Sequence, residues 1–80
     1  MKVREREQPS RIDTTDGTVI YEGFFNGNGT TPRYAIRRKT NVGTEWVVEW
    51  AGGTLNKIWE WTDRTALTYI ELTLLENYQG

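Results

Sequence analysis

The amino-acid sequence predicts an all-β protein, a small antiparallel barrel or sandwich of four to five strands organised on a central hairpin at residues 33–51. Apolar and polar residues alternate along both arms of this hairpin, as they do in strands that bury one face. The other apolar segments are short, and turn-forming residues separate them. Threonine, tyrosine and branched apolar residues fill the last segment, 67–75, and these residue types favour strands.

The chain begins with a charged segment, residues 1–11, which we expect to be a flexible arm in front of a single β domain at residues 12–80. Apart from the initial methionine, Val3 is the one aliphatic residue of this arm. One valine is too little to hold the arm on a core, so the arm is expected to fray. A competing hypothesis is that the arm becomes ordered on a neighbouring subunit.

Two elements are expected before the central hairpin. The dipeptide Asp16-Gly17 predicts a turn over residues 13–17, and residues 18–25 then form a strand. Gly23 lies inside that strand and suggests a bulge or a bend. Residues 26–32 are dense in glycine, asparagine and threonine, and they predict a flexible loop.

The register of the central hairpin follows from its turn. Residues 41–43 are expected to form a three-residue loop, with Gly43 in the left-handed region and Thr40 opposite Thr44. This register pairs apolar residues on one face and opposite charges on the other. The expected pairs are Tyr34/Trp50, Ile36/Val48 and Arg38/Trp46 on the apolar face, with Lys39/Glu45 and Arg37 near Glu49 on the charged face.

The C-terminal third is less regular. Glycines 52 and 53 end the second arm, and residues 55–63 fit either a short strand or an irregular loop. A turn is expected at residues 63–66. Residues 67–75 predict a strand with Ile70, Leu72 and Leu74 on one face, whereas a helix at residues 64–77 is the alternative that helical spacing allows.

Composition argues against catalysis. The chain has no histidine and no cysteine, which excludes the Ser-His-Asp and Cys-His nucleophile systems and ordinary structural zinc. Glu45 and Glu49 fit a solvated, charge-paired face better than an acid–base pair. Asp13 and Asp16 lack the terminal glutamate of a calcium loop, and the glycine-rich loop lacks the lysine of a phosphate-binding loop. We therefore expect a protein that is not an enzyme and that has no catalytic residue, metal or cofactor.

Binding to a partner is the remaining function class. The net charge of −1 gives no general electrostatic footprint for nucleic acid, and no apolar run approaches the length of a membrane span. Basic residues near aromatic residues keep a nucleic-acid-binding accessory protein as an alternative, and the tryptophans keep a carbohydrate-binding β module as another. The candidate partner-binding residues are Arg4, Arg6, Arg11, Arg37, Arg38, Trp59 and Trp61.

One pattern of core and turn residues resembles a family of short proteins encoded in the structural gene clusters of tailed bacteriophages. The pattern comprises Tyr21 and Gly23, the run Tyr34-Ala35-Ile36-Arg37-Arg38, the run Trp50-Ala51-Gly52-Gly53, the pair Ile58-Trp59, and residues 63–69. It covers half to two-thirds of the chain and stops eleven residues before its end. The resemblance implies a virion component made in the host cytoplasm, with a structural or assembly role. Its implied partners are other virion subunits or further copies of itself.

Overall fold

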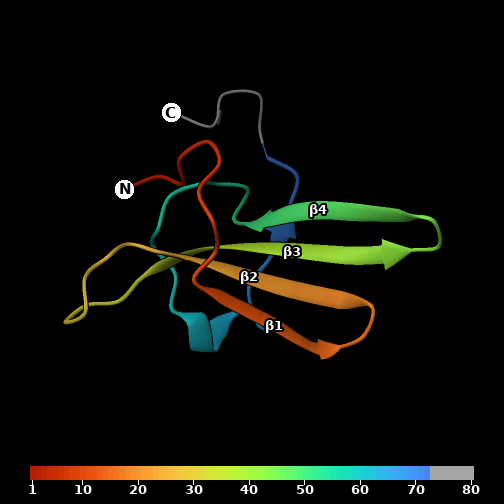
Figure 1. Ribbon diagram of the computed structural model, residues 1–80, viewed down its shortest axis with the longest axis horizontal. Helices are drawn as coiled ribbons and strands as arrows, with labels where there is room; N and C mark the ends of the chain where they lie inside the picture. Colours follow the sequence, from red (N-terminus) through yellow and green to blue (C-terminus); the bar gives the residue numbers. More distant parts are fainter. Residues whose placement is uncertain (73–80) are drawn as a thin grey trace.

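Five antiparallel strands form a single sheet in the computed structural model of the protein, which describes residues 1–72 (Figure 1). The strands follow one another across the sheet in the order of the sequence. They are β1 (Arg11–Asp16), β2 (Val19–Phe25), β3 (Tyr34–Val42), β4 (Glu45–Ala51) and β5 (Tyr69–Ile70). The predicted all-β class, the antiparallel pairing and the strand number are confirmed.

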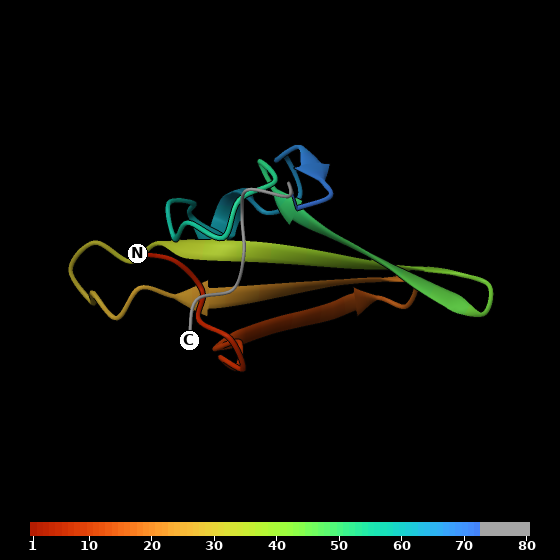
Figure 2. The same cartoon turned by 90° about the horizontal axis from the view of Figure 1, so that it is seen from above.

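The sheet is twisted and open. β1 and β5 are its two edges and do not pair with each other within residues 1–72, so the sheet is broadly consistent with the expected small barrel or sandwich but is not closed. Figure 2 shows the β3–β4 hairpin extending well past the rest of the molecule, with β4 crossing over β3 toward the tip. A large part of this hairpin therefore lies outside the packed core.

Apolar clusters lie on both sides of the sheet. Ala35 and Ile36 are neighbours in β3, and their side chains point to opposite sides. The cluster on the side of Ala35, which we call the first face, comprises Val3, Phe24, Ala35, Trp50 and Leu55. The cluster on the side of Ile36, the second face, comprises Tyr34, Ile36, Ala51 and Tyr69, with Tyr21, Phe25, Trp59, Trp61 and Leu67 packed against it.

β1 was not predicted. The turn expected over residues 13–17 is shorter and follows Asp16, which pairs with Val19 across Gly17 and Thr18, so residues 13–16 belong to the strand. The Asp16 carboxylate holds this turn by accepting hydrogen bonds from the backbone N–H and the hydroxyl of Thr18, both at 2.9 Å. β1 is a polar edge strand, and for that reason it carries no apolar alternation for the sequence to reveal.

The predicted three-residue loop of the central hairpin is wrong. Val42 pairs with Glu45, so the loop consists of two residues, Gly43 and Thr44. Gly43 has φ of +82° while Thr44 does not have a positive φ, and this combination marks a type II′ turn, because a type I′ turn has a positive φ at both loop positions. Such two-residue turns match the twist of the strands they join. Thr40 consequently lies opposite Val47, not opposite Thr44.

This change of register also replaces the predicted pairs. Arg37 lies opposite Trp50, Lys39 opposite Val48 and Arg38 opposite Glu49. The expected pairs Tyr34/Trp50, Ile36/Val48, Arg38/Trp46 and Lys39/Glu45 are not formed. Those pairs were expected because only one face of the hairpin was assumed to be buried. Because both faces carry a cluster near the base of the hairpin, Ile36 and Trp50 are both buried on opposite sides.

The C-terminal third is mostly irregular. Residues 55–63 form a loop that ends in a short 3₁₀ helix, η1 (Trp61–Asp63), and the predicted turn at 63–66 is confirmed by the Ala66 N–H bond to the Asp63 carbonyl, 2.9 Å. Within residues 64–72 the alternative helix is not formed, and the predicted strand is reduced to β5. Its buried side chain is Tyr69, while Ile70 is exposed. Residues 73–75 of the predicted strand lie outside the described residues.

The N-terminal segment packs on the first face, and the expectation that Val3 could not anchor it is wrong. Val3 is only 1% exposed, and its N–H donates to the Leu55 carbonyl at 3.0 Å. The Lys57 N–H donates to the Met1 carbonyl at 2.7 Å, and the Lys57 ammonium pairs with Glu7 at 2.6 Å. One valine suffices because backbone hydrogen bonds and an ion pair hold the segment beside it.

Gly23 serves a close contact and not a bulge. The pairing of β2 with β3 runs without interruption through Gly23. The ring of Trp61 covers this glycine so closely that a Cβ there would lie 2.8 Å from two ring carbons. The glycine therefore allows the loop at residues 55–63 to pack directly on the sheet.

Candidate functional site

Arg37, one of the candidate partner-binding residues, is engaged within the sheet. Its Nε donates to Glu22 Oε1 at 2.7 Å, and its guanidinium lies 5.1 Å from the Phe24 ring centre and 5.4 Å from that of Trp50. Lys39 also approaches Glu22, at 3.6 Å. Glu22 is buried, so these two cations offset the cost of removing its charge from water. Arg37 supports the first face and is not a free cation.

Arg38 has the equivalent role on the second face. It donates to Glu49 at 2.8 Å, and its guanidinium lies 4.6 Å from the ring centre of Tyr69. Burial raises the pKa of Tyr69, with a further contribution from the neighbouring Tyr21. The Tyr69 hydroxyl donates to the Arg64 carbonyl at 2.6 Å and ties β5 to the loop before it.

An ion pair that the sequence did not reveal joins β1 to the same loop. Arg64 Nε donates to Asp13 Oδ2 at 2.9 Å, and the guanidinium stacks on Trp61 at 4.7 Å. Hydrogen bonds from the Thr15 side chain and backbone, together with a smaller contribution from Arg64, lower the pKa of Asp13 to about 2. Fifty-one positions separate the two residues, so no local pattern pointed to the pair.

Arg4, Arg6 and Arg11 are the exposed members of the predicted set. Arg11 donates from Nε to the Tyr34 hydroxyl at 3.0 Å. Arg4 and Arg6 belong to a four-residue turn that the Glu7 N–H closes onto the Arg4 carbonyl at 3.1 Å. Arg6 has φ of +68°, a left-handed conformation that is uncommon for a residue with a side chain.

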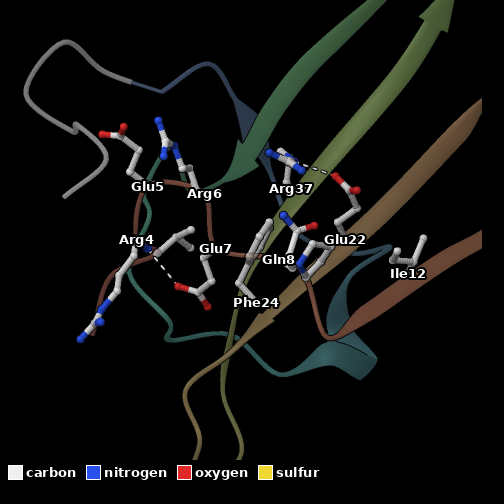
Figure 3. Close-up of a pocket in the computed structure, with 11 residues that line it drawn as sticks. Arg4, Glu5, Arg6, Glu7, Gln8, Ile12, Glu22, Phe24 and Arg37 are labelled. Carbon is white, nitrogen blue, oxygen red and sulfur yellow. Dashed lines mark hydrogen bonds and ion pairs between the residues drawn. The ribbon is translucent and has the colours of Figure 1, made fainter. Parts of the chain in front are cut away.

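This turn forms one wall of a pocket of about 420 Å3 above the first face (Figure 3). Phe24 and the Arg37–Glu22 pair line the opposite side, and Ile12 borders it. Figure 3 shows the Arg4 side chain pointing away from Phe24 and from the ion pair. Acidic and basic groups alternate around the pocket, so its charge selects neither anions nor cations.

Trp59 and Trp61 are half-buried supports of the second face. Trp61 covers Gly23 and lies 5.9 Å from Tyr34, ring centre to ring centre, at an angle of 51°. Trp59 packs against Gly52. Its backbone exchanges hydrogen bonds of 2.7 and 2.9 Å with that of Tyr34. Their rings are therefore not displayed as a free stacking platform.

Two exposed apolar side chains, Trp46 and Val48, lie on one face of β4 toward the tip of the hairpin; the other large exposed apolar side chains of the described residues are Met1, Ile12, Val42, Ile58 and Ile70. Trp46 is 46% exposed and Val48 is 42% exposed. Both belong to the first face, because they alternate with Trp50 in β4, and Val48 lies in one row with Lys39 and Ile20. The predicted register placed Val48 opposite Ile36 on the apolar face and Trp46 opposite Arg38 at the rim of that face. In the observed register Val48 lies opposite Lys39 and Trp46 opposite Asn41, away from the buried base of the hairpin.

Within residues 1–72 no group of three acidic side chains is placed to hold a metal ion. No helix in the same residues is long and apolar enough to cross a membrane. The side chains that combine exposure with strong binding potential are the apolar pair at the hairpin tip and the arginines of the N-terminal turn.

Comparison with known protein families found no match, and neither a search of curated proteins nor a search of solved structures found a similar chain.

Proposed function

We propose that the protein is a non-enzymatic structural or assembly component of a bacteriophage virion and that it acts through protein–protein contacts. The exposure of Trp46 and Val48 on a projecting hairpin carries this proposal. Large apolar side chains that share one exposed face mark interaction surfaces, and tryptophan is enriched at protein interfaces. The assignment to a virion rests on the sequence resemblance over residues 21–69 and makes other virion subunits the partners.

The charge distribution favours a protein partner over nucleic acid. Arg37, Arg38 and Arg64 each pair with a carboxylate of the same chain at 2.7 to 2.9 Å. Arginines held in this way are poorly available for phosphate contacts, which supply most of the affinity for nucleic acid. A carbohydrate platform is likewise disfavoured, because Trp46 lies on the first face while Trp59 and Trp61 pack on the second.

The test is the composition of purified particles of the encoding phage, measured by quantitative mass spectrometry. The wild-type chain is expected at a fixed copy number, and a variant with Trp46→Ser and Val48→Ser is expected to fold but to be lost from the particle. Val42→Ser is the matched control, because Val42 is an exposed apolar residue on the opposite face of the same hairpin. Absence of the wild-type chain from particles, together with DNA binding that weakens steeply with salt, would replace this proposal with the nucleic-acid alternative.

A further inference from the structure

Among residues 1–72, the outer edge of β4 has no neighbouring strand along most of its length. β5 pairs only with Trp50 and Ala51, so residues 45–49 have no strand beside them within the described chain. Figure 1 shows the same arrangement, with β5 behind one end of β4 and no described segment along the rest of its outer side. An open edge presents unpaired backbone donors and acceptors to an incoming strand.

Backbone directions identify the residues whose polar groups face this open edge. The Asn41 N–H donates to the Thr18 carbonyl at 2.8 Å, so the backbone N–H and C=O of Asn41 point toward β2. The backbone groups of its neighbours Thr40 and Val42 therefore point the other way, toward β4. Opposite residues of an antiparallel pair exchange hydrogen bonds at every second position. The partners of Thr40 and Val42, which are Val47 and Glu45, therefore point back to β3.

Trp46 and Val48 consequently point their N–H and C=O groups away from the sheet. A second bond supports this direction independently. The Gly52 N–H donates to the Thr68 carbonyl at 2.8 Å, on the side of β5. Gly52 lies an even number of residues from both Val48 and Trp46, so all three use the same edge. Trp46 and Val48 thus combine outward-pointing backbone groups with exposed apolar side chains.

The chemistry of the edge defines what fits it. β4 carries no lysine or proline, the residues that commonly protect an edge from pairing. Its first face offers Trp46 and Val48, and its second face offers Glu45 and Glu49. The Glu49 carboxylate is already paired with Arg38, while Glu45 forms no ion pair with the other described residues. A matching strand therefore has apolar residues on one side and basic residues on the other.

We infer that β4 binds an extended segment of another protein chain as an added antiparallel strand, with apolar residues beside Trp46 and Val48 and with Lys or Arg beside the glutamates. This inference rests on the proposed function and names its partner class and its surface. Antiparallel pairing is chosen because it is the more stable kind and because β5 already runs antiparallel to β4.

A second copy of the chain fits this edge poorly. The register that brings the two apolar residues of each copy together has a two-fold axis at Val47 and places Trp46 of each copy opposite Val48 of the other. The same axis places Glu45 opposite Glu49 twice, and like charges directly opposite one another are destabilising. The inference therefore assigns the edge to a different chain.

The test uses a labelled, end-blocked synthetic heptapeptide in which valine alternates with lysine, and fluorescence anisotropy measures its binding to the full chain. In antiparallel pairing, the residues beside Trp46 and Val48 point their N–H groups toward β4. Methylation of the valine backbone nitrogens should then weaken binding at least tenfold. Methylation of the lysine backbone nitrogens should leave binding within about twofold. Equal binding of the two methylated peptides, or the reverse preference, would overturn the inference.

A protein variant tests the same edge from the other side. Val48→Pro removes an outward N–H that β3 does not use, whereas Val48→Thr keeps the N–H and the branched shape. The proline variant should lose peptide binding at least tenfold and the threonine variant should keep it. If the proline variant fails to fold, the methylated peptides still decide. Particle incorporation without peptide binding would refute this inference alone, whereas peptide binding by a chain absent from particles would refute the virion function alone.

Discussion

Replacing Val3 by Ala should destabilise the whole domain, because Val3 belongs to the core cluster of the first face. The substitution removes two carbon atoms from a side chain that is 1% exposed, among Phe24, Trp50 and Leu55. At about 0.8 kcal/mol for each buried carbon group, the lost burial amounts to about 1.6 kcal/mol. The cavity left behind raises the expected loss to about 2–3 kcal/mol.

Thermal unfolding followed by circular dichroism measures this effect. For a domain of this size, a loss of about 2 kcal/mol lowers the Tm by roughly 8–16 °C. The matched control is Val42→Ala, the same substitution at a side chain that is 55% exposed, which should cost less than about 0.5–1 kcal/mol. Equal shifts for the two variants would refute the conclusion that the N-terminal segment is part of the core.

Three further predictions concern the turn, the loop contact and the ion pair. Gly43→Val should lower the free energy of unfolding by about 1–3 kcal/mol, because a φ of +82° strains a β-branched residue. No atom lies within 4 Å of the new Cβ, so the cost comes from the backbone alone. An unchanged denaturant midpoint would contradict the type II′ turn. Gly23→Ala should lower the free energy of unfolding by about 1–3 kcal/mol, because its Cβ would lie 2.8 Å from the Trp61 ring. Gly17→Ala is the control and should be nearly neutral, since no atom lies within 4 Å of its Cβ. Equal effects of the two substitutions would refute the close contact. The pKa of Asp13 is lowered from 3.8 to about 2, so its contribution to stability is present above pH 4 and is lost as the pH falls toward 2. Asp13→Asn should therefore reduce the change of Tm between pH 4 and pH 2. An NMR titration midpoint of Asp13 near 3.8 would refute the lowered pKa.

The sequence was sufficient to predict the fold class and the existence of the central hairpin. Alternation around Ile36 and Trp50 marked both arms, and Gly43 marked the turn. The register was not predictable by the same argument, which assumed a single buried face. Both faces are covered at the base of the hairpin and one is open at its tip, so alternation alone could not determine which residues lie opposite one another.

The candidate site was predictable only in part. Arg37 and Arg38 were found as basic residues near aromatic residues, but their carboxylate partners depend on the pairing of strands. Trp46 was expected opposite Arg38 at the rim of the apolar face. The two-residue turn instead places it opposite Asn41, and its exposure could not be predicted without that register. β1 was missed because an exposed polar edge strand is held by backbone hydrogen bonds that leave no signal in side-chain type.

Amide hydrogen exchange in β4 of the dilute monomer, resolved by NMR, tests the hairpin register and the open edge together. The amides of Val47 and Glu49, which point to β3, should exchange slowly, and those of Trp46 and Val48, which point outward, should exchange fast. A hairpin with Thr40 opposite Thr44 would reverse this pattern, because Trp46 and Val48 would then point to β3. Slow exchange at Trp46 and Val48 would therefore contradict both the register and the open edge.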